Sequence, residues 1–272
     1  MTRVLSALTL ILLAVAGPLG ADTFTLTSNN SSIAVDPHSQ RGVYSWTIDG
    51  EEVMFQQWFW IRVGGDTREI PVVAPLHSMS PGVTDAATAV YSSPTYDIQM
   101  NFTLVGGQPN SKVSALNEHI SILNKSSAYL PVSFFQYSNI RFSQGNDTTQ
   151  FLSDNTVQQT GQGDLSFFLD ETIVNTLSLT HHEAGVFPQT LDRLNDDQPT
   201  TLNDNDFARG NATWAFQWDK VLRPRSGVLV IDKNLNISDP PAPVPVPEPG
   251  AFVLLASCAA IYTAWRRRRL PR

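Results

Sequence analysis

Residues 97–104 (DIQMNFTL) decide the fold class of this chain. Apolar and polar residues alternate strictly there, which places four apolar side chains on one face of an extended segment: Ile98, Met100, Phe102 and Leu104. Gly106-Gly107 ends the run. A helix would need apolar residues three and four positions apart, so the segment is predicted to be a β-strand with one buried face.

The same kind of pattern continues on both sides of this segment. Residues 43–48 and 51–55 flank Asp49-Gly50, a pair that favours a two-residue hairpin turn because both central residues take positive φ. Further strands are predicted at 114–123, 130–137, 165–169, 172–180, 212–219 and 227–232. No capped helical pattern interrupts them. We therefore predict an all-β ectodomain over 22–238, a two-sheet β-sandwich with a large, supersandwich-like form as one version of it.

Composition excludes several classes of protein. The chain has 272 residues and is 42% hydrophobic, too apolar for a disordered chain. Residues 22–240 carry 24 acids and 12 bases, a net charge of −12 that repels nucleic acid. A single cysteine excludes a disulfide framework. Glycine motifs for nucleotides are missing from the sequence, and we predict no cofactor.

The two ends of the chain differ from the middle. Residues 1–21 combine Arg3, an apolar run at 4–16 and small residues before Ala21, as a signal peptide does. Residues 239–249 alternate proline too densely for helix or sheet, which predicts an extended linker. The uncharged stretch 250–265 is predicted to be a single, short transmembrane helix, and the arginines of 266–272 to lie in the cytoplasm.

The order of the tail carries a family resemblance. Pro247-Glu248-Pro249, a short apolar helix and then Arg266, Arg267, Arg268 and Arg269 resemble the PEP-CTERM sorting signal of Gram-negative bacteria, over about residues 246–272. The resemblance implies an inner-membrane-anchored precursor, processed by an exosortase-type membrane transpeptidase after signal peptidase and the general export machinery have acted. It also implies a final place at the cell surface or in the extracellular matrix, near exopolysaccharide.

An aromatic block provides the candidate binding residues. Trp58, Trp60 and Arg62 fall in one strand with two glutamines before them, a composition that suits stacking on sugars. Large apolar groups on both faces of this strand are also what a doubly buried strand shows, and core packing is the interpretation that the pattern favours. Trp214, Phe216 and Trp218 are expected in the core for the same reason.

Metal and catalytic sites are less well supported by the sequence. Asp204 and Asp206 are candidate calcium ligands in an Asp/Asn-rich loop, although a solvated loop is favoured because the EF-hand template fails. His181 and His182 are adjacent on a predicted strand and point to opposite faces, so they cannot share a metal without a bulge. Paired carboxylates for glycoside hydrolysis remain open, with no position singled out.

These observations predict a non-enzymatic exported surface or matrix protein, delivered by its tail and associated with exopolysaccharide. The alternative is a carbohydrate-binding module that uses its aromatic residues. A polysaccharide-acting enzyme is a third interpretation, because the strand-rich outline resembles the mutarotase-like sandwiches.

Overall fold

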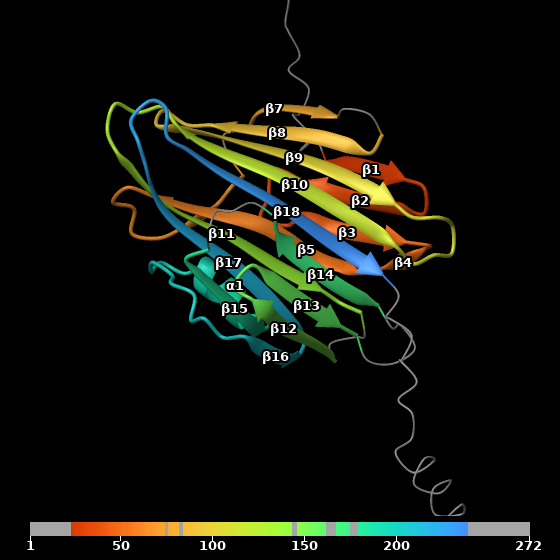
Figure 1. Ribbon diagram of the computed structural model, residues 1–272. Coiled ribbons are helices and arrows are strands. Elements are labelled where there is room, and N and C mark those ends of the chain that lie inside the picture. Colours follow the sequence, from red (N-terminus) through yellow and green to blue (C-terminus); the bar gives the residue numbers. More distant parts are fainter. Residues whose placement is uncertain are drawn as a thin grey trace, which may run out of the picture. The chain divides into compact units, whose positions relative to one another are not determined.

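The computed structural model describes residues 23–73, 76–81, 84–142, 146–161, 167–174 and 179–238, and side chains are not described within 76–81. In this part of the chain the strands form two nine-stranded sheets (Figure 1). All strand pairs are antiparallel except the short parallel contact between β3 and β5. The predicted all-β, two-sheet architecture is thus confirmed.

The first sheet, sheet A, has seven strands along its main path and two short ones beside it. Along the path its order is β1 (Phe24–Ser28), β2 (Ser31–Asp36), β3 (Gly42–Ile48), β5 (Met54–Val63), β11 (Leu130–Ile140), β17 (Ala212–Leu222) and β15 (His181–Val186). The short strands β4 (Glu51–Glu52) and β6 (Ile70–Pro71) pair with β3 and β5.

The second sheet, sheet B, is one continuous path of nine strands. Its order is β16 (Phe207–Gly210), β12 (Asp147–Ser153), β13 (Thr156–Thr160), β14 (Phe168–Ile173), β18 (Val228–Ser238), β10 (Ser114–Asn124), β9 (Tyr96–Gly106), β8 (Ala86–Ser92) and β7 (Leu76–Pro81). The helix of the described chain, α1 (Gln189–Leu194), follows β15.

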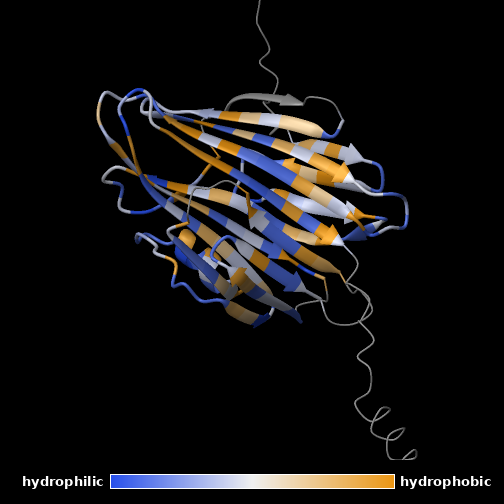
Figure 2. Ribbon diagram, in the orientation of Figure 1, coloured by the Kyte–Doolittle hydropathy of each residue, from blue (hydrophilic) through white to orange (hydrophobic). Residues whose placement is uncertain are grey.

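Alternation along the strands explains why the sheets stack. In β9 the side chains of Ile98, Met100, Phe102 and Leu104 are buried as the sequence predicts, and polar residues occupy the other face (Figure 2). The predicted hairpin joins β3 to β4, with φ of 51° at Asp49 and 86° at Gly50. Some boundaries differ: the predicted strands at 165–169 and 172–180 meet in the single strand β14, with 165–166 and 175–178 outside the described residues, and the strand predicted at 227–232 continues as β18 to Ser238.

Large aromatic side chains fill the core. Trp46, Trp58, Trp214, Trp218 and Phe134 are among the largest fully buried side chains of the described chain. A core of this size is what lets polar groups be held at fixed positions on the outer faces of the sheets.

The predicted signal peptide, linker, transmembrane segment and basic tail lie outside the described residues. Among the described residues, no helix has the length and apolar character needed to cross a membrane.

Candidate functional site

The outer face of sheet A carries a cover made of α1 and the loop 195–206. The alternation of side chains along β5 shows which face of sheet A is the outer one. The Gln57 amide donates to Glu118 of sheet B, so Gln57 points inward. Trp60 and Arg62 lie on the opposite face of the strand and point away from sheet B. The loop is tied down by hydrogen bonds from Trp60 Nε1 to Asn195 Oδ1 (3.2 Å) and from the Leu202 N–H to Gln217 Oε1 (2.9 Å). This cover buries the centre of the face and leaves its end open.

An open groove of about 350 Å³ remains at that end, and we call it the sheet A groove. It is lined by Arg62, Pro131, Val132, Ser133, His181, Thr201, Gln217, Asp219, Lys220 and Val221. Its volume falls in the range of small-molecule sites. The lining combines a guanidinium, an imidazole, an amide, a carboxylate and hydroxyls.

Strand register brings these groups together from distant parts of the sequence. Ser133 on β11 pairs with Arg62 on β5 and with Asp219 on β17. Two residues before Asp219 on β17, and on the same face, Gln217 pairs with His181 on β15. Directly opposed residues on one face of a sheet have their Cβ atoms about 5 Å apart. Two adjacent rows of polar side chains therefore form the floor of the groove.

Arg62 is held in place by three acceptors. Its Nη1 donates to Glu69 Oε2 and to the Thr200 carbonyl, each at 3.1 Å, and its Nη2 donates to Ser133 Oγ at 3.1 Å. Glu69 is almost fully buried and also accepts the Thr200 N–H at 3.2 Å. The ion pair therefore fixes both the guanidinium and the loop beside it.

The carboxylate of Asp219 is the least satisfied group of the groove. Its Oδ2 accepts from Gln217 Nε2 at 2.8 Å, and Gln217 is itself oriented by the Leu202 N–H. Its Oδ1 is buried and has no hydrogen-bond partner among the described residues. A buried acceptor without a donor costs about 1–3 kcal/mol. Asp219 Oδ1 therefore calls for a donor such as a water or a ligand hydroxyl.

His181 supplies an imidazole whose orientation is fixed. Asp204 Oδ2 lies 2.9 Å from His181 Nδ1 and Asp204 Oδ1 accepts the His182 N–H at 3.1 Å. Burial acts to raise the pKa of Asp204, but these hydrogen bonds outweigh it and hold the pKa below its usual value. With Nδ1 engaged by the carboxylate, Nε2 is the ring nitrogen of His181 that remains for a ligand.

The three binding residues predicted from the sequence differ in their exposure. Trp58 and Trp60 are fully buried, and their Nε1 atoms are bound to the Val72 carbonyl and to Asn195. This placement favours the core-packing interpretation, because neither ring offers a face to a ligand. Arg62 does line the groove, with 17% of its side chain exposed.

The two candidate calcium ligands are engaged with histidines. Asp204 contacts His181, and Asp206 Oδ1 lies 2.7 Å from His182 Nε2. Within the described ranges, no three His, Cys, Asp or Glu side chains group closely enough to hold a metal ion. Both aspartates therefore contact imidazoles in this structure.

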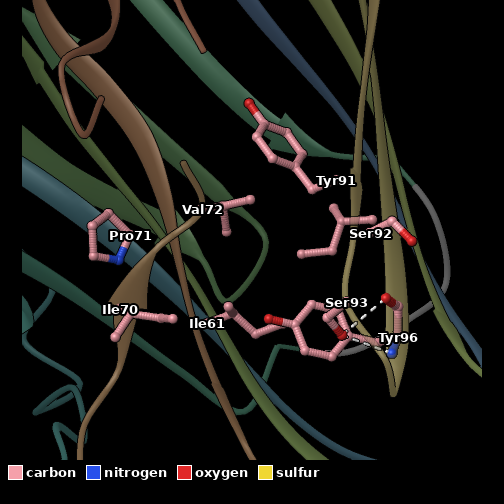
Figure 3. Close-up of a pocket in the computed structure, with 9 residues that line it drawn as sticks. Ile61, Ile70, Pro71, Val72, Tyr91, Ser92, Ser93 and Tyr96 are labelled. Carbon is pink, nitrogen blue, oxygen red and sulfur yellow. Dashed lines mark hydrogen bonds between the residues drawn. The ribbon is translucent and has the colours of Figure 1, made fainter. Parts of the chain in front are cut away.

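Two other hollows provide a contrast. On the outer face of sheet B, a groove of about 340 Å³ runs over Asn101, Asn117, His119, Asp232 and Asn234 and their neighbours; we call it the sheet B groove. Its floor follows strand register, and His119 Nδ1 lies 2.5 Å from Asp232 Oδ1. A cavity near the β8–β9 turn is far smaller, at about 10 Å³, and holds at most a water (Figure 3).

Comparison with known proteins shows the fold. The described sandwich is similar to part of a bacterial glucoamylase complexed with acarbose, with a TM-score of 0.54 and 12% identity over 84% of this chain. The chain spans about a third (34%) of that protein's length. A putative aldose 1-epimerase from Escherichia coli K12 matches at 0.49 and 10% identity, covering 81% of this chain and 100% of its own. A galactose mutarotase-like protein from Lactobacillus casei matches at 0.46 and 10%, covering 79% and 100%.

No family model and no curated protein matches the sequence. The structural comparisons nevertheless correct the sequence-based prediction of a non-enzymatic surface protein, because a similar sandwich forms part of an enzyme, the glucoamylase. That prediction relied on the lack of linear catalytic motifs, which is weak support when a site is assembled across strands. The correction leaves the carbohydrate alternative as the better one.

Sequence reasoning missed Ser133, Gln217 and Asp219 as groove residues, and treated His181 only as a metal ligand. A signal for them exists in the sequence. Each is a polar residue within a strongly apolar strand, in phase with residues on the covered face. Nothing local indicates that these strands are neighbours.

Proposed function

We propose that the protein binds a carbohydrate in the sheet A groove and acts on it by proton transfer. The observation that carries the proposal is the Asp219 carboxylate, whose buried Oδ1 has no donor among the residues that the structure describes, while Gln217 and His181 lie beside it. Sugars present many hydroxyl donors and acceptors on a neutral frame. A site for them needs fixed carboxylates, amides and guanidinium groups rather than net charge.

The chemistry of the groove suits general acid–base catalysis. A carboxylate and an imidazole with a fixed tautomer stand on adjacent strands, and Arg62 can stabilise developing negative charge on an oxygen. The reaction class that we propose is proton transfer at a sugar's ring or glycosidic oxygen. The likeness of the fold to a part of a glucoamylase supports a carbohydrate ligand at the level of fold alone.

The test is a calorimetric titration of the purified protein with a panel of monosaccharides, oligosaccharides and bacterial exopolysaccharide. Anomer interconversion and reducing-sugar release are measured on the sugars that bind. We expect Asp219→Asn to weaken binding about 10- to 100-fold, the usual effect of losing a charged hydrogen bond. Asp232→Asn in the sheet B groove is the matched control and is expected to change the Kd by less than about twofold.

Two results would overturn the proposal. One is a panel in which no sugar binds the folded protein. The other is an equal loss of affinity in Asp219→Asn and Asp232→Asn, which would place the ligand elsewhere.

Location is a separate proposal that rests on the ends of the chain. We infer that residues 1–21 direct export and that Pro247-Glu248-Pro249 with the arginines at 266–269 directs processing by an exosortase-type enzyme. Mass spectrometry of the mature protein's C-terminus tests this. A C-terminus that ends near residue 249 is expected, and an intact Arg272 would contradict it.

A further inference from the structure

A group of three charged side chains lies inside the sandwich, far from water. Glu118 on β10, Glu171 on β14 and Lys233 on β18 each have no exposed side-chain surface. Glu118 and Lys233 are direct cross-strand partners on the inner face of sheet B. Lys233 Nζ contacts Glu118 Oε2 and lies 2.9 Å from Glu171 Oε1. We call these three residues the interior cluster.

The two carboxyl groups of the cluster have different surroundings. Glu171 accepts hydrogen bonds from Gln136 Nε2 at 2.7 Å and from Trp214 Nε1, as well as from Lys233. Glu118 is bound by Gln57 Nε2, at 3.1 Å and 2.9 Å from its two oxygens. Glu171 therefore accepts hydrogen bonds from three different side chains, whereas Glu118 contacts two, Gln57 and Lys233.

Glu118 is correspondingly suited to the neutral, acid form. Burial raises the pKa of Glu118, and the nearby Glu171 raises it further, against the opposing effect of Lys233. Two carboxylates facing one ammonium would leave one negative charge uncompensated in the core. The Phe59 ring, whose centre is 5.4 Å from Lys233 Nζ, adds to the apolar wall around the amine.

We propose that Lys233 and Glu118 form an intramolecular amide bond, with Glu171 as the proton carrier. The Lys233 ammonium gives one proton to the Glu171 carboxylate, and the neutral amine attacks the Glu118 carboxyl carbon. A C–N bond forms and a C–O bond breaks. The departing hydroxyl leaves as water with one proton from the nitrogen, and Glu171 keeps the proton it received. Gln57 Nε2 donates to the oxygen that becomes negative during the attack.

The interior drives this condensation forward. In water an amide is exposed to hydrolysis, but the three side chains of the cluster have no surface exposed to solvent. The product also replaces a buried ion pair, whose desolvation is costly, with a neutral group. Because Lys233 Nζ contacts an oxygen of the carboxyl group that it would attack, the reaction gains the rate advantage of an intramolecular step.

The consequence is a covalent bond between β10 and β18 of sheet B. The linked residues are far apart in sequence, so the bond closes a long loop and restricts the unfolded chain, as a disulfide would. β18 is the last strand of the sandwich. An amide at Lys233 would therefore resist peeling of the strand at which the sandwich ends.

Peptide mapping of the full chain tests the proposal. The purified protein is denatured, digested with trypsin and analysed by tandem mass spectrometry. We expect a branched peptide that joins residues 113–125 to the segment containing Lys233, lighter than the two separate peptides by one water. Trypsin should fail to cut after Lys233. The exposed pair of Lys125 and Asp97, at 2.6 Å, is the internal control and should remain unlinked.

Linear peptides with cleavage after Lys233 would overturn the proposal. A water loss located elsewhere, such as at Asp49-Gly50, with Lys233 still cleaved, would overturn it equally. The wild-type result does not depend on any variant folding.

The role of Glu171 is tested in the Glu171→Gln variant, whose fold is verified by circular dichroism. We expect amide formation to slow by at least about 100-fold, the contribution of a positioned proton carrier. Glu183→Gln, another buried carboxyl but outside the cluster, should leave the branched peptide unchanged. Full linkage in Glu171→Gln would assign the proton transfer to another group.

Discussion

The two outer faces of the sandwich use similar side chains in different ways. Sheet A is covered by α1 and the loop 195–206, and its groove holds Arg62 by three hydrogen bonds, Gln217 by two and the His181 imidazole by its contact with Asp204. Sheet B has an uncovered face, and there the His119–Asp232 pair leaves 49% and 43% of its side chains exposed. A row of polar side chains on a sheet therefore becomes a candidate site when a cover holds those side chains in place. Side chains that are already held lose less conformational entropy when a ligand binds.

The largest expected effect comes from removing the ring on which the cover lies. Trp60→Ala is expected to lower the free energy of unfolding by about 3–5 kcal/mol, because a fully buried indole and its bond to Asn195 are lost. Thr103→Ala on the open face of sheet B is the matched control, expected to change stability by less than about 0.5 kcal/mol. Urea denaturation monitored by tryptophan fluorescence measures both. Equal effects would show that the cover contributes nothing.

The second prediction concerns a variant that weakens the attachment of the cover without removing a buried aromatic side chain. Glu69→Gln removes the charge that pairs with Arg62, and it is expected to cost about 1–3 kcal/mol. Because Glu69 also accepts the Thr200 N–H, the loop 195–206 should become more sensitive to limited proteolysis. Asp232→Asn removes the corresponding exposed pair on sheet B and should cost less than about 1 kcal/mol. An unchanged cleavage rate in Glu69→Gln would mean that the loop is held by its other contacts.

This contrast also explains what could be predicted from the sequence. Strand β9 and the Asp49-Gly50 hairpin were predictable because alternation and turn chemistry are local signals. The groove was not, because Arg62 and Ser133 are 71 residues apart and meet only through long-range register. Core packing was favoured for Trp60, but a binding role stayed open because the sequence does not show which segment will cover it.

The interior cluster could be predicted from the sequence only in part. Glu118 and Lys233 stand in phase with the inward residues Leu116, Ile120 and Ile231, so alternation alone marks both as buried charges. The pairing of β10 with β18 could not be read in the same way. Phase predicts that a charge is buried, but only topology shows which group neutralises it.

The smallest expected effect is the pH dependence of the stability that Asp204 contributes near the end of the loop 195–206. The pKa of Asp204 is lowered on folding, so its hydrogen bonds with His181 and with the His182 N–H contribute stability above a pH of about 4, the ordinary aspartate value. That contribution is lost as the pH falls through the lower folded-state pKa, and the exposure of the Asp204–His181 pair keeps it below about 1 kcal/mol.

The variant Asp204→Asn isolates this contribution. Wild type should be slightly more stable than the variant at pH 6, and the gap should close toward pH 3 in denaturant titrations. Asp232→Asn beside His119 supplies the matched measurement on the open face. The lack of any gap for Asp204→Asn at either pH would mean that its hydrogen bond to the His182 N–H, rather than its charge, anchors the loop, since an amide oxygen can still accept that bond. The cover of sheet A would then be held by uncharged contacts at this end, and charge would act on it through the Arg62–Glu69, Arg68–Asp197 and Arg193–Glu183 pairs.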